Sequence, residues 1–183
     1  MEAAVKAVQL YSTEMSNIEN YYKTINSYID TEINKLDIRN ASLDRGVGYV
    51  RNSYELMGNY RQIMSKTAEQ IDNINLALAA MKEVLAQGLA NGRIQVGDQE
   101  YIRLTTQITE LENQGKSLGN TMLDTWDKML EIPDKKLQER LKKIANSFKW
   151  FSAIMDNNIS NLDERKIFAG FMQELDNEFG DMG

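Results

Sequence analysis

Carboxylates, lysines, tyrosines and hydroxyl groups are the side chains with which this chain could do chemistry, because its 183 residues include neither cysteine nor histidine. The lack of cysteine excludes disulfides, thiolate nucleophiles and thiolate metal sites. The lack of histidine removes the usual activating base of serine and the commonest ligand of transition metals. The sequence has no phosphate-binding Gly-x-x-x-x-Gly-Lys-Ser/Thr motif and no EF-hand spacing. We therefore predict no catalytic, cofactor-binding or metal-binding residues, and a protein that is not an enzyme.

Basic residues follow Pro133, the only proline of the chain, at helical spacing. Lys136, Arg140 and Lys143 form one stripe beside an apolar face. The first interpretation is a solvated helix surface, and the second is a basic patch for a partner protein. Contact with nucleic acid or a membrane surface is a third, but the net charge of −6 and the isoelectric point near 4.8 argue against general binding of nucleic acid. We predict that this stripe reaches water and that no nucleic acid is a partner.

The segment 87–98, QGLANGRIQVGD, is a second candidate site, because it is rich in glycine and longer than most connections between bundled helices. A plain connector would be polar, whereas this one contains two apolar side chains between Arg93 and Val96. Loops carry function more often than the helices that support them. We predict a protein contact formed by Arg93, Ile94, Val96 and Tyr101. The alternative is a flexible turn without a partner.

Apolar residues spaced three and four apart predict the helices that hold these candidates. In the first segment the spacing is unbroken through Val8, Tyr11, Met15, Ile18, Tyr22, Ile25, Ile29, Ile33 and Leu36. Comparable stripes predict helices over residues 3–37, 43–89, 98–131, 134–156 and 162–178. Asp98 is expected to cap the third helix. Pro133 is expected to end it, because a proline disfavours the α conformation of the preceding residue.

Residues 37–48, DIRNASLDRGVG, interrupt the first stripe. Asn40, Ser42 and Asp44 are good residues for a helix N-cap. Gly46 and Gly48 each weaken a helix by about 1 kcal/mol relative to alanine. We therefore predict a turn here, with the second helix beginning between residues 42 and 47.

These stripes predict one all-α domain over residues 1–183, an elongated antiparallel bundle of three long helices with one or two shorter C-terminal helices. Phe148, Phe151 and Met155 should face its core. Tyr21 and Tyr28 lie beside the first stripe and should widen it, with a tyrosine-rich ligand site as the alternative. The longest apolar run, residues 76–81, is far shorter than the roughly 20 residues of a membrane span. We predict no transmembrane helix.

The general pattern of the chain resembles the TrbJ-type family of conjugal transfer proteins, minor pilus subunits of type IV secretion systems. The resemblance lies in the tyrosine-rich stretch NIENYYKTINSYI, the very long second helix and a late helix that runs into FSAIMDNNISNL. It implies an exported protein with an elongated helical bundle and a smaller globular part, and a place at or near the pilus tip.

Two functions follow as hypotheses. The first is a non-enzymatic structural or adhesive subunit of a bacterial conjugation apparatus, with other proteins of the assembly as partners. We expect it to be periplasmic or extracellular if a signal peptide was removed, and cytoplasmic otherwise. The start MEAAVKAVQLYS does not itself have the pattern of a signal peptide. The second is a cytoplasmic helical adaptor or a phage-type structural protein that acts through helix–helix contacts.

Overall fold

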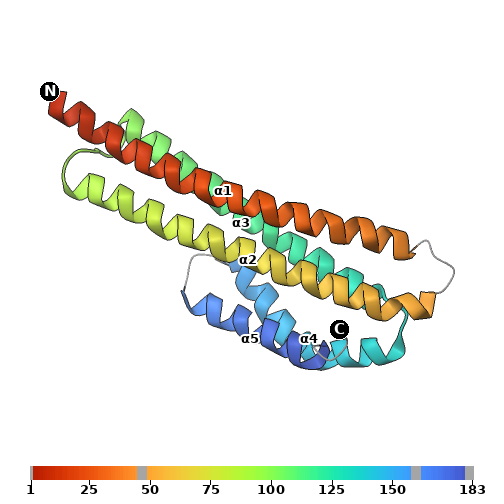
Figure 1. The fold of residues 1–183 in the computed structure, drawn as a ribbon. Coiled ribbons are helices and arrows are strands. Elements are labelled where there is room, and N and C mark those ends of the chain that lie inside the picture. The colour runs from red at the N-terminus through yellow and green to blue at the C-terminus, as the bar shows by residue number, and fades with distance from the viewer. Residues whose placement is uncertain (1, 45–48, 158–161, 180–183) are drawn as a thin grey trace.

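The computed structural model describes residues 2–44, 49–157 and 162–179, and within them the side chains of 13–43, 52–146, 148–149 and 169–179. All regular structure in these ranges is helical, as the sequence predicted (Figure 1). The five helices are α1 (Glu2–Asp44), α2 (Tyr49–Ala90), α3 (Gln99–Glu131), α4 (Lys135–Asn157) and α5 (Leu162–Phe179). Three long helices are thus followed by two shorter ones.

The end of α1 differs from the expectation, because the helix continues past residue 37 to Asp44 and α2 begins only at Tyr49. Asn40 is therefore not an N-cap. It is buried inside the contact between the two helices, where its side-chain oxygen accepts a hydrogen bond of 2.8 Å from Asn59. Leu43 packs on the core one turn later. The three-and-four spacing in fact continues from Leu36 through Asn40 to Leu43, with a polar residue at one step.

Helix α2 is the centre of the packing. It lies along α1 on one side and along α3 on another, whereas α1 and α3 approach each other much less closely (Figure 1). Helices α4 and α5 pack on each other, and together they cover only one part of the surface that α2 and α3 present (Figure 1). The molecule is consequently thicker where α4 and α5 lie than at the turn between α2 and α3.

Two hydrophobic cores lie one after the other along the long helices. The three-helix core is formed by α1, α2 and α3 together with Ile94 from the turn, and its buried residues are Met15, Ile74, Ala77, Leu78, Met81, Val84, Ile94, Leu104, Ile108 and Leu111. The five-helix core takes residues from every helix, for example Ile29, Met57, Met122, Phe148 and Phe171. Phe148 faces this core as predicted. The side chains of Phe151 and Met155 lie outside the described residues.

The residues expected to begin and end α3 do so, and a further polar contact defines the start of α4. Asp98 is the N-cap of α3, and Ile132 ends that helix with an extended backbone (φ −63°, ψ 120°), as expected for a residue before proline. Asp134 then caps α4, because its side chain accepts hydrogen bonds from the backbone N–H groups of Lys136 and Leu137 at 2.9 and 3.1 Å. Pro133 therefore precedes the cap and is not itself part of α4.

Candidate protein-contact surfaces

The turn between α2 and α3 has a defined backbone path. The N–H groups of Arg93 and Ile94 both donate to the carbonyl of Gly88, at 3.0 and 3.1 Å. Gly92 and Gly97 take left-handed conformations, with φ of 64° and 91°, which cost glycine nothing and other residues about 1–2 kcal/mol. The glycines of this segment thus allow sharp reversals of the chain in a turn where the N–H groups of residues 91 to 95 all donate hydrogen bonds.

Asp98 connects the turn to α3. Its two carboxylate oxygens accept hydrogen bonds from the backbone N–H of Gln95 at 2.9 Å and from that of Tyr101 at 2.6 Å. These two N–H groups lower the pKa of the Asp98 carboxyl below its ordinary value, because they favour the charged form. Since the pKa is lower in the folded protein, the cap stabilises the fold at neutral pH. That stabilisation is lost as the pH falls through the lowered pKa.

Ile94 is not available to a partner, which corrects the expectation for this residue. Its side chain is fully buried in the three-helix core. A Cβ atom at Gly88 would lie only 2.4 Å from Ile94 Cδ1, so the glycine provides the space into which the isoleucine fits. The apolar character of Ile94, which suggested a contact surface, instead reflects a side chain that fastens the turn to its own helices.

The remaining predicted contact residues lie at the surface of the same end. Val96 is 76% exposed and Arg93 is exposed, while Tyr101 is half-buried against the three-helix core. Ile102, which the sequence analysis did not select, is 56% exposed. A signal for Ile102 was present, because it is an apolar residue outside the stripe formed by Tyr101, Leu104 and Ile108. Val96 and Ile102, which precede and follow Asp98 in the sequence, are thus the two exposed apolar side chains of this segment.

The predicted basic patch on α4 is only partly free of intramolecular contacts. Lys136 is exposed, as predicted. Arg140 is half-buried and its Nη1 donates to the backbone carbonyl of Glu178 at 2.8 Å. Lys143 Nζ lies 3.5 Å from the Glu178 carboxylate. Two of the three basic residues therefore contact the last turn of α5, where cations interact favourably with the helix dipole.

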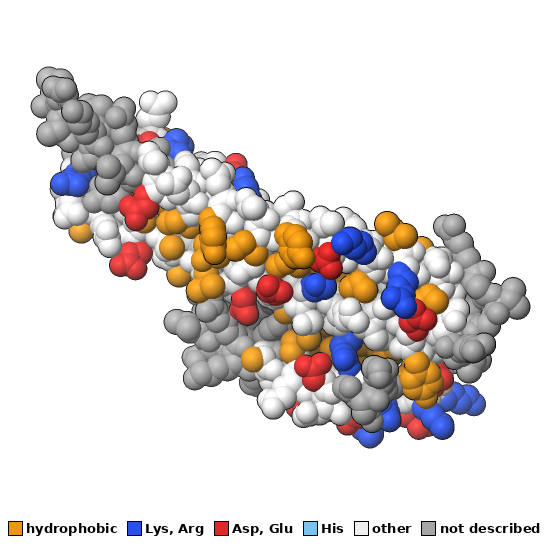
Figure 2. Space-filling view, in the orientation of Figure 1, with side chains coloured by type: hydrophobic (Ala, Val, Ile, Leu, Met, Phe, Trp, Pro, Cys, Tyr) orange, Lys and Arg blue, Asp and Glu red, His pale blue; other side chains and the backbone are white. Residues whose placement is uncertain are grey.

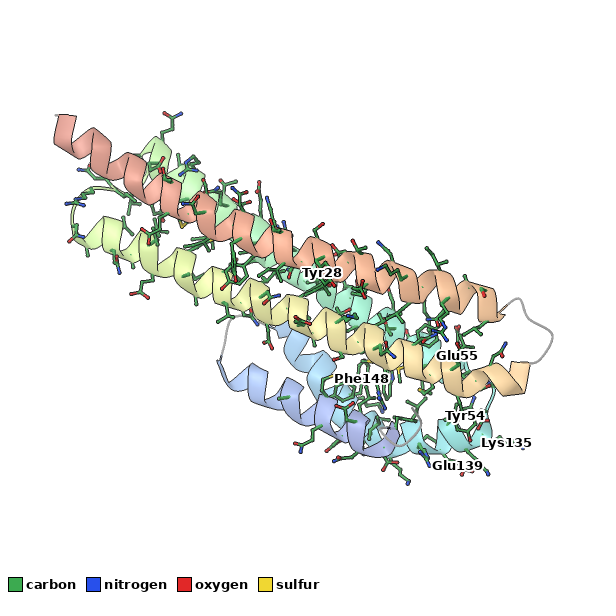
Figure 3. All side chains as sticks on the ribbon, in the orientation of Figure 1. Tyr28, Tyr54, Glu55, Lys135, Glu139 and Phe148 are labelled. Carbon is green, nitrogen blue, oxygen red and sulfur yellow. The ribbon has the colours of Figure 1, made fainter. Side chains whose placement is uncertain are left out.

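The exposed surface of α4 carries further charges of both signs. Lys135, Lys142 and Lys149 are exposed, and so is Glu139. Lys135 and Glu139 are labelled in Figure 3. Among the acidic residues near the C-terminus, Glu178 supplies a counter-charge through its contact with Lys143. Asp176 pairs with Arg61 of α2 at 3.7 Å, and Asp181 lies outside the described residues. The basic stripe thus serves in part to hold α5 in place.

Tyr21 and Tyr28 do not widen the core, which corrects a second expectation. Their side chains are 63% and 69% exposed on α1. Tyr21 makes an edge-to-face contact with the half-buried Tyr22, at 5.3 Å between ring centroids, and Tyr28 lies near the middle of the molecule (Figure 3). On the face shown in Figure 2, hydrophobic side chains occur in separate small groups along the long axis. Single exposed hydrophobic residues are ordinary on protein surfaces.

Comparisons with known proteins supply no relative. No family model, no curated protein and no solved structure matches the chain. Within the described residues, no cluster of three or more acidic side chains is placed to hold a metal ion. None of the described helices has the length and apolar character needed to span a bilayer.

Proposed function

We propose that this chain is a non-enzymatic structural subunit of a bacterial conjugation apparatus of the type IV secretion class. In this proposal it is an exported protein that acts in the periplasm or at the cell surface through contacts with other proteins of the assembly. The resemblance in helix pattern supports the setting. The observation that carries the contact role is the pair of exposed apolar side chains, Val96 and Ile102, beside a turn with a hydrogen-bonded backbone.

A well-defined turn suits a protein contact for a thermodynamic reason. Association must offset the entropy lost when mobile side chains and loops become ordered. The backbone of this turn is already held by the carbonyl of Gly88 and by the Asp98 carboxylate, and Ile94 fastens it to the core. Val96 and Ile102 would therefore bind with little further ordering of the backbone.

The proposal includes an elongated shape, in which the three long helices form an antiparallel bundle with the turn between α2 and α3 at one far end. Helices of 43, 42 and 33 residues have lengths of roughly 50–65 Å at about 1.5 Å per residue. Small-angle X-ray scattering of the monomer is expected to show a rod. A compact, nearly spherical monomer would contradict this part of the proposal.

The contact role is tested by making the end of the molecule polar without disturbing the core. The variant Val96→Ser/Ile102→Ser should melt at the temperature of the wild type, because both side chains are largely exposed. In a donor strain without the native gene, it should restore conjugal transfer much less than the wild type does. The matched control is Leu76→Ser/Leu130→Ser, which changes two exposed apolar residues elsewhere and should transfer normally.

Three outcomes decide between the possibilities. If Val96→Ser/Ile102→Ser melts like the wild type but loses transfer, and the control variant does not lose it, the result supports a contact at the turn. Normal transfer by the variant, when deletion of the gene abolishes transfer, rejects the turn as the contact but keeps the conjugation setting. Normal transfer after deletion of the gene rejects the setting itself.

A further inference from the structure

Two asparagine pairs join α1 to α2 at places where the rest of the contact is largely apolar. Asn59 Nδ2 donates to Asn40 Oδ1 at 2.8 Å, and both side chains are buried. Asn73 Nδ2 donates to Asn26 Oδ1 at 3.1 Å. Asn40 lies two heptads after Asn26, and Asn59 lies two heptads before Asn73. The two pairs therefore belong to one antiparallel register of the two helices.

Gln70 adds a second set of contacts beside the pair formed by Asn26 and Asn73. Its buried Nε2 lies 3.0 Å from the backbone carbonyl of Asn26 and 2.6 Å from Asp30 Oδ1. In return, Asn26 Nδ2 donates to the backbone carbonyl of Gln70 at 3.4 Å. Along α2 this layer occurs where the buried residues of the five-helix core end, at Ile71, and those of the three-helix core begin, at Ile74. It thus separates the two cores along α2.

The apolar residues by themselves do not select this register, because they repeat along both helices. A slip of α1 by one heptad along α2 would set Ile18 against Ile74, Ile29 against Ile63 and Leu36 against Leu56. Each of these contacts is apolar on both sides, so the slipped arrangement would still bury much of the hydrophobic surface.

The polar residues respond differently to the same slip. It would set the buried Asn59 against Ile33 and would take Gln70 away from Asp30. A buried polar group that loses its hydrogen-bond partner costs about 1–3 kcal/mol. Polar residues at core positions of coiled coils select register in this way, at some cost in stability.

We propose that Asn40, Asn59 and Gln70 form a register lock, which keeps α1 from sliding along α2 by a heptad. The lock has a cost in stability, because Asn40 Nδ2 and Gln70 Oε1 are buried without a hydrogen-bond partner. Replacing the three polar side chains by leucine should consequently keep or raise the stability of the fold, while a second register becomes populated.

The experiment measures the distance between one spin label on α1 and one on α2. Because the chain contains no cysteine, the exposed residues Thr31 and Glu83 can be changed to cysteine and labelled without further substitutions. A slip of one heptad moves one helix along the other by about 10 Å. Pulsed electron–electron double resonance measures the distance between two spin labels and resolves a change of this size.

The lock is removed in the variant Asn40→Leu/Asn59→Leu/Gln70→Leu, and an alanine version of the same triple variant guards against overpacking. The matched control is Asn34→Leu/Gln62→Leu/Asn113→Leu, which replaces three exposed polar residues. The wild type and the control should each show a single distance. The triple variants should show a second population displaced by about 10 Å, and the leucine variant should melt no lower than the wild type.

Two results would overturn the proposal. A single unchanged distance in a folded triple variant would mean that Asn40, Asn59 and Gln70 are not needed to select the register. Loss of cooperative melting in both the leucine and the alanine variants, with the control intact, would mean that these residues stabilise the fold and do not serve to select its register.

Discussion

The three-helix core and the five-helix core differ in the kind of side chain that fills them. The first is built largely from leucine, isoleucine and methionine. The second contains an aromatic cluster, in which Trp126 of α3 stacks on Phe148 of α4 with ring centroids 4.2 Å apart and meets the edge of Phe171 of α5 at 6.0 Å. The large rings lie where α4 and α5 pack on α3. Larger side chains are needed there to fill the space between the helices at the usual packing density.

The two cores also differ in how far the rest of the molecule covers them. The aromatic cluster is formed by side chains of three helices, α3, α4 and α5. Helix α5 is also held by polar contacts with Arg61 of α2 and with Arg140 and Lys143 of α4. Among the described side chains, Ile94 of the turn packs into the three-helix core. Exposed apolar side chains are found on that turn and the start of α3. The end with the thinner covering is therefore the one on which we place the partner contact.

The largest expected effect is in the five-helix core. Trp126→Ala should lower the free energy of unfolding by about 3–5 kcal/mol, because it removes a buried aromatic side chain and leaves a cavity. Leu104→Ala, in the three-helix core, is the comparison and should cost about 2–5 kcal/mol. Denaturant unfolding of both variants measures the difference. A smaller loss at Trp126 than at Leu104 would show that the aromatic cluster is not the more stabilising of the two.

An intermediate effect is expected where the turn closes the three-helix core. Gly88→Ala should lower the free energy of unfolding by about 1–3 kcal/mol, because the new methyl group meets Ile94 Cδ1 in a packed core. Ile94→Val removes that carbon atom and makes room, so the double variant should recover part of the loss relative to Gly88→Ala. Additive losses in the double variant would disprove the close contact as the cause.

The smallest effect is expected at the ion pair between α4 and α5. Lys143→Ala should change the free energy of unfolding by less than about 0.5 kcal/mol, because an exposed pair gains little in water. Lys142→Ala removes a neighbouring exposed lysine that has no ion pair among the described residues and serves as the control. A loss above about 1 kcal/mol at Lys143 alone would indicate that α5 depends on this pair.

Local signals in the sequence were sufficient for most helix ends but not for all. Asp98 and Pro133 act on their immediate neighbours, so the ends of α3 could be predicted from residue type. Asn40 is equally suited to cap a helix, yet it lies inside α1 because Asn59 of α2 offers it a hydrogen-bond partner. The outcome at Asn40 depends on a helix that follows later in the chain, and therefore on packing.

The candidate contact site was predictable only in part. The glycines and apolar residues of segment 87–98 indicated a turn of special character, and Val96 is exposed as expected. That Ile94 is buried could not be inferred, because the two residues have similar hydrophobicity and lie two positions apart. The space that Gly88 leaves on α2 decides which of them turns inward.

By itself, the sequence determined that the chain is helical and that each helix has one apolar face. It did so because a stripe spaced three and four residues apart can be buried only by a helix. Tertiary structure decided which surfaces remain in water, as the exposed Tyr21 and Tyr28 show, and that Arg140 and Lys143 hold α5. A periodic pattern shows that one face of a helix must be buried. Which element buries that face depends on how segments that are distant in the sequence pack together.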